Sequence, residues 1–270
     1  MTDSAISPIE TNAGWSFAAT FRNARLVLLP VTTAISALIL WEVLARAFGI
    51  REVILPTPST IYETLSRGLP LLLRHAAPTA KEAVLAYIIA CSLGVVTAAI
   101  LTYSRLLREC VLPNLIALQF IPKVALAPLF IIWFGLGIEA RLTFAVFVAF
   151  FPVMISTAAG LTNTPPEYVR LGRALIASEP QIFAAIRFPS AIPFIFSGMK
   201  IAATMTMIGV VVGEFITAKE GLGYLILFAS SKAETSLIFA CLVLLCVIGL
   251  AMYGLILAAE RIVTSIYKLQ

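Results

Sequence analysis

The sequence predicts an all-α protein that crosses a membrane six times. Of its 270 residues, 60% are hydrophobic and only 12% are charged, whereas a soluble domain carries about 25% charged residues. Six apolar runs reach the length of about 20 residues that a helix needs to cross the hydrocarbon. Lipid offers no partner for backbone N–H and C=O groups, so these runs must be helical. This pattern excludes a disordered chain, a disulfide scaffold and an ordinary soluble enzyme.

The six expected spans differ in where they carry charge. The first has Glu42 and Arg46 near one end, the third is interrupted by Lys123 and prolines, and the fifth contains Lys200. The second and fourth are uncharged throughout. Together the spans form one transmembrane domain over residues 26–260, preceded by a cytoplasmic segment 1–25 and followed by a cytoplasmic tail 261–270. Their expected bounds are 26–48, 83–103, 111–137, 142–163, 192–216 and 237–259.

A polar connector, residues 49–82, separates the first two spans and is rich in Pro, Ser and Thr. Ser59 is a suitable N-cap residue, so we expect a short helix from Ser59 to Arg67. His75, the single histidine of the chain, is expected on the outer surface of this connector. One histidine cannot form a multi-histidine metal site, and we expect neither a metal nor a cofactor on this chain.

The distribution of basic residues sets the expected orientation. Without Lys123, ten Lys and Arg residues fall on the side of the N-terminus and eight on the other. Cytoplasmic segments carry the excess of Lys and Arg, so both termini are expected in the cytoplasm. The net charge of +5 matches contact with anionic lipid headgroups. The basic residues are scattered among loops, so we expect no nucleic-acid partner.

Residues 164–188 form a loop with two helix-start signals. Thr164-Pro165-Pro166-Glu167 has the pattern of a capping box, with Thr164 as N-cap, and predicts a helix to about Ile176. Ser178, with Gln181 three residues later, predicts the start of a second helix. Such a helix pair either protrudes into the cytosol and docks another protein or lies against the headgroups, and the spacing alone leaves both readings open.

The same segment resembles the cytoplasmic coupling loop of ABC importer permeases. That motif reads Glu-Ala-Ala, three residues, Gly, nine residues, Ile-x-Leu-Pro. Its end is matched by Ile186, Phe188 and Pro189. Its first half is degenerate, because the places of Glu, Ala, Ala and Gly are taken by Arg170, Leu171, Gly172 and Ile176. A turn at Ile176 therefore lacks the glycine that readily adopts a positive φ.

Further stretches are similar to one branch of these permeases, those of nitrate, sulfonate and taurine importers. The similarity extends over most of the chain from about residue 40 and rests on the order and spacing of short motifs. These motifs are Trp41-Glu42, Leu55-Pro56-Thr57-Pro58-Ser59, Pro122 with Ala127-Pro128-Leu129, Trp133-Phe134-Gly135-Leu136-Gly137, Phe151-Pro152, Pro189 with Pro193, Gly198, Glu214 and Gly221-Leu222-Gly223.

The resemblance implies a multi-subunit importer in the bacterial inner membrane. Two permease subunits, identical or different, would form the pathway, two ABC ATPases would dock on the coupling loops, and a periplasmic binding protein would deliver the solute. The chain has no G-x-x-x-x-G-K-[ST] motif, so we expect it not to be an enzyme and expect ATP and Mg²⁺ on the partner ATPase. The expected coupling-loop residues are Glu167, Arg170, Leu171, Gly172, Leu175, Ile176, Ser178, Ile186 and Pro189.

Five polar or small residues of the spans are candidates for the translocation pathway: Lys123, Thr204, Thr206, Gly209 and Glu214. Each has a structural alternative. A lysine can extend to the interface, threonines in membrane helices bond their own backbone, and Gly209-x-x-x-Gly213 permits close helix packing. Glu214 can instead pair with Lys219 or cap the following loop.

The solute expected from the resemblance is small: an anion such as nitrate or a sulfonate, an aromatic acid, or a heterocyclic vitamin precursor. An alternative function is a secondary transporter or channel without an ATPase. Such proteins show inverted repeats or buried ion-coupling carboxylates, and neither is visible in the sequence. A membrane enzyme would need a cluster of acids, histidines or Ser-Lys pairs at matched depth, and the acids here lie near the ends of the spans.

Overall fold

A computed structural model describes residues 13–267, which form helices and no strand, as the fold prediction required. Five helices are long and apolar enough to cross a membrane: α1 (Ala13–Ala47), α3 (Leu69–Tyr103), α6 (Ile138–Thr162), α9 (Phe188–Thr217) and α11 (Thr235–Ile266). The shorter elements are α2 (Pro58–Arg67), α4 (Arg105–Leu118), α5 (Lys123–Phe134), α7 (Pro166–Ala174), α8 (Glu179–Ile182), the π-helical turn η1 (Phe183–Arg187) and α10 (Leu222–Ser231).

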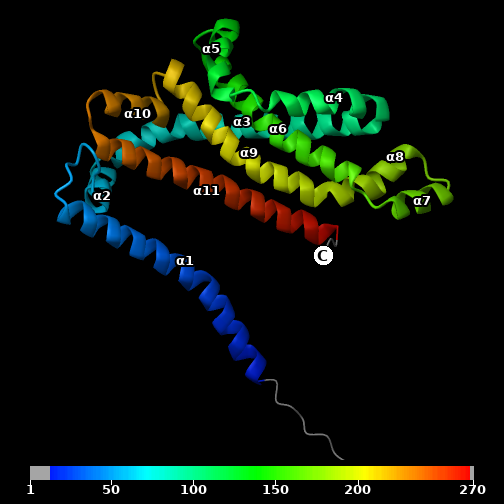
Figure 1. Cartoon of the computed structure of the whole chain (residues 1–270), viewed down its shortest axis with the longest axis horizontal. Helices are drawn as coiled ribbons and strands as arrows, with labels where there is room; N and C mark the ends of the chain where they lie inside the picture. Colours follow the sequence, from blue (N-terminus) through cyan, green and yellow to red (C-terminus); the bar gives the residue numbers. More distant parts are fainter. Residues whose placement is uncertain (1–12, 268–270) are drawn as a thin grey trace, which may run out of the picture.

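The core of the bundle is the packing of α6 against α3 and α9 (Figure 1). Small residues let these helices approach closely: Ala145 of α6 is fully buried among Ala83, Ala86 and Val210. The glycine pair of α9 faces α6, because a Cβ added at Gly209 would lie 2.7 Å from the Cα of Ala145. The Gly-x-x-x-Gly motif therefore packs inside the bundle, which was its structural alternative.

The third expected span, 111–137, is not one helix. It is divided into α4 and α5, whose axes differ by 98°, so the pair is either a broken span or a re-entrant segment. Pro122 has no backbone N–H and disfavours helical φ and ψ at the residue before it, so the chain breaks there. Counting this pair as one span gives six, and leaving it out gives five.

Two of the expected boundaries on the polar connector are wrong. The N-cap of α2 is Thr57, whose Oγ1 accepts a hydrogen bond from the backbone N of Thr60 at 3.3 Å, and Pro58 takes the first helical position. The helix α3 already begins at Leu69, so His75 lies within it rather than on a surface loop. His75 is half-buried, and its Nδ1 accepts a hydrogen bond from the backbone N of Gly221.

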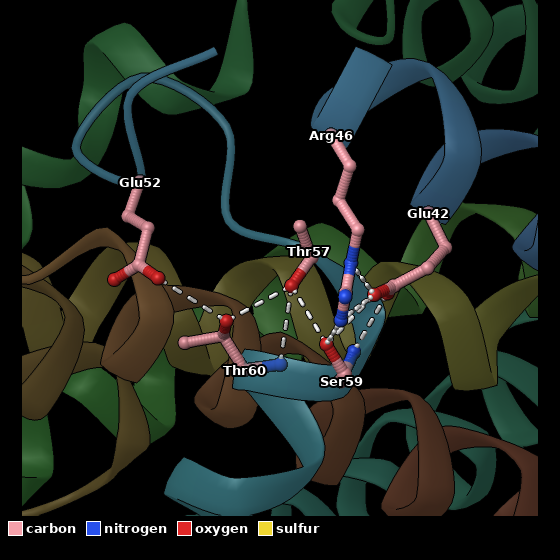
Figure 2. Close-up of polar contacts among 6 residues, drawn as sticks. All are labelled: Glu42, Arg46, Glu52, Thr57, Ser59 and Thr60. Carbon is pink, nitrogen blue, oxygen red and sulfur yellow. Dashed lines mark hydrogen bonds and ion pairs between the residues drawn. The ribbon is translucent and has the colours of Figure 1, made fainter. Parts of the chain in front are cut away.

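The first helix is joined to the bundle by a polar elbow. Glu42 accepts hydrogen bonds from the backbone N and the Oγ of Ser59 at 3.0 and 2.8 Å, and it also bonds Arg46 (Figure 2). Besides its contact with α2, α1 places the ring of Trp41 5.5 Å, centroid to centroid, from that of Phe239 in α11, and the rest of α1 extends away from the bundle (Figure 1). The Trp41-Glu42 and Leu55–Ser59 motifs thus meet at this elbow.

The terminal segments expected outside the membrane are largely helical where they are described. Residues 13–25 form the start of α1, and α11 continues through residues 261–266. Residues 1–12 and 268–270 of those expected segments lie outside the described residues. A further short helix, α10, packs against α3, α9 and α11. Its ten residues are too few to cross the bilayer, so hydropathy alone gave no reason to expect it.

Candidate functional site

The loop between α6 and α9 forms a compact helical unit at one end of the bundle (Figure 1). The helix α7 contacts only α8 and η1 among the described elements. The second expected helix begins at Ser178, but it runs through η1 directly into α9 instead of ending before a separate span. The unit is therefore one free helix, α7, held against an extension of α9.

The first helix-start signal was wrong in register and the second was right. The N-cap of α7 is Pro165, and Thr164 Oγ1 donates instead to the carbonyl oxygen of Leu161 at 3.3 Å. A residue before proline favours extended backbone, so Pro165 stays non-helical and Glu167 occupies the second helical position. At α8, Ser178 is the N-cap, and Gln181 Oε1 accepts a hydrogen bond from its backbone N at 2.8 Å.

Gly172 explains how α7 is held. It is the buried residue of α7, and a Cβ added to it would lie 3.1 Å from Ile186 Cδ1 and 3.2 Å from Ile182 Cγ1. On the rim, Arg173 bonds Glu179 at 2.9 and 3.1 Å. Of the expected coupling-loop residues, Gly172 and Ile186 thus form the internal contact of the unit rather than its outer surface.

The outer face of the unit is apolar. Tyr168, Leu171 and Leu175 are 57%, 59% and 73% exposed, and the following Ile176 is 93% exposed. The first three recur at spacings of three and four, which places them on one side of α7. We call these four residues the α7 apolar face. Grouped exposed apolar side chains mark a contact with another protein or with a membrane.

The turn that ends α7 has unusual backbone geometry. Ile176 has φ +59°, a region that β-branched residues seldom adopt. The backbone N of Ile176 donates to the carbonyl of Arg173, and that of Ala177 donates to the carbonyl of Gly172, which is the Schellman pattern. The turn of the coupling-loop motif is thus kept, although isoleucine stands in the position that favours glycine.

The candidate pathway residues of α9 do not gather into one site. Thr206 is fully buried and donates to the carbonyl of Ala202 at 2.7 Å, so its hydroxyl serves its own helix. Thr204 is exposed on the outside of the bundle. Glu214 is 1% exposed and accepts hydrogen bonds from Thr79 Oγ1 and the backbone N of Gly223, both at 2.6 Å. It therefore caps α10 and does not pair with Lys219.

A buried ion pair next to Glu214 was missed by the sequence analysis. Arg141 of α6 donates to Glu82 of α3 through Nε at 3.1 Å and through Nη2 at 2.5 Å. Their side chains are only 12% and 5% exposed. Glu82 was placed just outside the second span and Arg141 just before the fourth, so hydropathy assigned both to loops. The bidentate geometry is what makes a buried pair of this kind tolerable.

Lys123 lies at the first position of α5, directly after the break. Its Nζ is 5.1 Å from the ring centroid of Phe151, the fourteenth residue of the 25-residue α6. At 1.5 Å per residue, Phe151 is about 20 Å from the start of α6, so the ammonium lies beside the middle of that helix. A lysine at the centre of a membrane helix costs about 2.5–3.5 kcal/mol on insertion scales.

Comparison with known proteins places the chain in a family. The binding-protein-dependent transport system inner membrane component matches residues 90–266. A probable ABC transporter permease protein of Haemophilus influenzae is 33% identical over 227 residues, which cover 84% of this chain and 93% of that protein. The riboflavin transport system permease protein RibX of Chloroflexus aurantiacus is 32% identical and covers 87% of this chain and 88% of its own length.

Solved structures show the same fold. A chain of the MetNI methionine ABC transporter in an inward-facing conformation superposes with a TM-score of 0.63 at 20% identity, covering 73% of this chain and 98% of that one. The α7 unit, the apolar spans and the family match agree with one another. The chain belongs to the binding-protein-dependent transport system inner membrane components, and it is a multi-pass permease subunit of an ABC importer.

Proposed function

We propose that this permease forms half of a pathway for a small solute that a periplasmic binding protein delivers and a partner ATPase drives. The observation that carries the proposal is the α7 apolar face, which no described part of the chain covers. An amphipathic helix with exposed apolar residues suits insertion into a groove of another protein. ATP and Mg²⁺ would be bound by that partner.

The position of α7 suits the transmission of force. The unit of α7, α8 and η1 continues into α9, and α9 makes the most extensive contact of the fold with α6. A push on α7 is therefore passed through Gly172, Ile182 and Ile186 to the base of α9. Rigid-body movement of packed helices is an established way to open one side of a pathway and close the other.

The orientation in the membrane follows from the same proposal. An ATPase that docks on α7 must be cytosolic, so this end of the bundle faces the cytoplasm. The described end of α11 lies at the same end of the bundle as α7 (Figure 1), which supports a cytoplasmic C-terminus. The elements at this end of the bundle carry several arginines: Arg170 and Arg173 in α7, Arg187 in η1, and Arg261 near the end of α11. Their presence agrees with the excess of positive charge on cytoplasmic segments.

The test is co-purification of the ATPase with the permease. In the double variant Leu171→Asp/Leu175→Asp, the two apolar side chains that docking would bury become charged. ATPase capture and ATP-dependent uptake are therefore expected to be lost, while membrane insertion is retained. Ala174→Asp is the matched control, because it adds a charge to the same helix beside the α7 apolar face and is expected to keep the ATPase. Undiminished ATPase capture by the double variant would reject α7 as the docking element.

The same purification identifies the second permease subunit. A single permease species in the intact complex would establish a homodimer, whereas a second permease with the regular coupling motif would establish a heterodimer. The alternative function, a secondary transporter or channel, predicts uptake without any ATPase. ATP-dependent uptake in proteoliposomes excludes that alternative.

A further inference from the structure

Three consecutive backbone N–H groups at the start of α10, those of residues 221–223, each donate to a different side chain. The acceptors are His75 Nδ1 at 3.1 Å, Thr79 Oγ1 at 2.8 Å and Glu214 Oε2 at 2.6 Å, in that order. The three donors belong to buried residues, where an N–H without an acceptor costs free energy. These side chains therefore hold the start of α10 against α3 and α9.

A proton would reverse the role of His75 in this arrangement. Its Nδ1 accepts from Gly221 only while the imidazole is neutral and carries its hydrogen on Nε2. An imidazolium ion donates through both nitrogens and accepts through neither, so two N–H groups would then face each other. The ring stacks on Tyr224 of α10 with centroids 6.0 Å apart, and it is half-buried, so solvent can reach it. Histidine is the side chain that ordinarily changes charge between about pH 5 and 8.

Glu214 is the buried acid beside this contact, because its carboxyl group is what a Cβ added to Gly221 would meet. Its two oxygens already accept from Thr79 Oγ1 and from the backbone N of Gly223. An imidazolium that turned toward this carboxylate would compete with those donors. Protonation of His75 therefore disturbs the start of α10 whether or not the ring turns toward Glu214.

The other ionisable groups near His75 do not replace the lost acceptor. Tyr224 of α10 and Cys241 of α11 are a phenol and a thiol, and both groups are neutral in the range in which histidine titrates. Glu82, about two turns farther along α3, is bonded to Arg141 of α6. Water and salt screen the exposed ions. These are Arg74 and Lys81 on α3, Lys219 and Glu220 before α10, Lys232 after it, Glu63 and Arg67 on α2, and Glu234 before α11.

We propose that His75 is an acid-sensitive latch on the outer side of the permease: protonation of its ring releases Gly221 and loosens α10 from α3. The helix α10 lies at the end of the bundle opposite to α7 (Figure 1), which is the periplasmic end in the proposed orientation. The binding protein would deliver its solute at this end, so acid outside the membrane would weaken delivery. This effect on delivery rests on the proposed function, whereas the latch itself rests on the contacts of His75 and residues 221–223.

Hydrogen exchange of the full-length permease in nanodiscs tests the latch. Protection of the amides of residues 221–225, corrected for the intrinsic effect of pH on exchange, is expected to be about tenfold lower at about pH 5.5 than at about pH 7.5. Tenfold corresponds to about 1.4 kcal/mol, the size expected for a buried N–H that loses its acceptor. Amides in the middle of α6 are the internal control, because a general loss of structure in acid would expose them as well.

Two substitutions separate the charge of His75 from its role as acceptor. His75→Asn keeps an acceptor oxygen near the position of Nδ1 and does not take up a proton in this range, so its α10 protection is expected to stay constant. His75→Lys carries a positive charge at both pH values and has no acceptor, so its α10 protection is expected to be low at both. Where a variant does not insert, the wild type at the two pH values still decides.

ATP hydrolysis stimulated by the binding protein tests the consequence for delivery. The complete complex is placed in proteoliposomes with ATP inside at neutral pH and the binding protein outside, so that only the outer side is acidified. The wild-type complex is expected to lose more of its stimulation in acid than the His75→Asn complex. An equal loss in both would show that the binding protein or another group responds to acid, and it would overturn the effect on delivery.

The remaining outcomes also decide the proposal. Equal protection of wild-type α10 at both pH values would overturn the latch, and so would a joint loss of protection in α6. A pH effect that persists in His75→Asn would assign it to another group, such as Glu214, and would overturn the role of His75. Failure of the proposed function looks different, because the wild-type permease would then capture no ATPase, while hydrogen exchange of the permease alone could still show the latch.

Discussion

Glu214 of α9 accepts a hydrogen bond of 2.6 Å from Thr79 of α3, although 135 residues separate them in sequence. The Thr79 hydroxyl in turn accepts a hydrogen bond from the backbone N of Leu222 at 2.8 Å, and Glu214 accepts one from the backbone N of Gly223. Two side chains thus satisfy the first backbone donors of α10 inside the protein. This network fastens the short helix α10 to two membrane helices.

Removal of the Thr79 hydroxyl is expected to loosen α10. In Thr79→Val, the buried N–H of Leu222 and the carboxylate of Glu214 each lose a partner, which costs about 1–3 kcal/mol per unsatisfied group. Thermal unfolding of the detergent-solubilised permease measures the loss. Thr79→Ser keeps the hydroxyl and is the control. Equal stability of the valine variant and the wild type would show that the network contributes little.

The Glu82–Arg141 pair is expected to show strong coupling. Arg141→Gln leaves the buried Glu82 carboxylate uncompensated, and breaking a buried pair in this way costs about 3–5 kcal/mol. The double variant Glu82→Gln/Arg141→Gln removes both charges and is expected to be more stable than either single variant. A double-mutant cycle of unfolding free energies tests this prediction, and simple additivity would contradict it.

Ile176 is expected to destabilise the turn that ends α7 while adding exposed apolar surface to the α7 apolar face. A non-glycine residue in the left-handed region costs about 1–2 kcal/mol, so Ile176→Gly is expected to stabilise the turn that ends α7. The same change removes an apolar side chain that is 93% exposed, so ATPase capture is expected to weaken. Hydrogen exchange of α7 amides measures the first effect and co-purification measures the second. Ile176→Asn, which also tolerates this conformation, should behave like glycine.

The substitution Gly209→Ala is expected to destabilise the contact between α6 and α9, because it adds a methyl group where the helices touch. Its Cβ would lie 2.7 Å from backbone of Ala145, so the helices must separate, and overpacking typically costs about 1–3 kcal/mol. Gly254→Ala is the matched control, because no heavy atom lies within 4 Å of its added Cβ. That control is expected to be neutral or slightly stabilising, since alanine favours helix over glycine by up to about 1 kcal/mol. Thermal unfolding distinguishes the two variants.

The all-α membrane fold was predictable because it depends on hydropathy alone. The run 237–259 lies within the single long helix α11, and the run 142–163 lies within α6 up to Thr162, since no alternative satisfies their backbone in lipid. The location of the helical unit at 164–188 was also predictable, because the second start signal at Ser178 acts through neighbouring residues. Thr164 misled because adjacent Pro165 and Pro166 shifted the helix start by one residue.

Polar contacts between distant elements could not be read from spacing. Glu82 and Arg141 were assigned to loops because hydropathy is averaged over neighbours in the sequence. It contains no information about the helix that each side chain faces. The 98° break before Lys123 was hidden for the same reason, since the whole run 111–137 is apolar enough to span. Proline marked a weak point there without giving the direction in which the chain would turn.

The sequence by itself determined that this chain is a bundle of membrane helices with a helical loop between its fourth and fifth apolar runs, because burial of apolar residues in lipid and local capping require no long-range contact. Only the tertiary structure decided that Gly172 is buried while Leu171 and Leu175 are exposed, that Glu214 caps α10, and that Lys123 lies beside Phe151. Each of these depends on which helices meet, and packing of small residues such as Gly209 against Ala145 sets that arrangement.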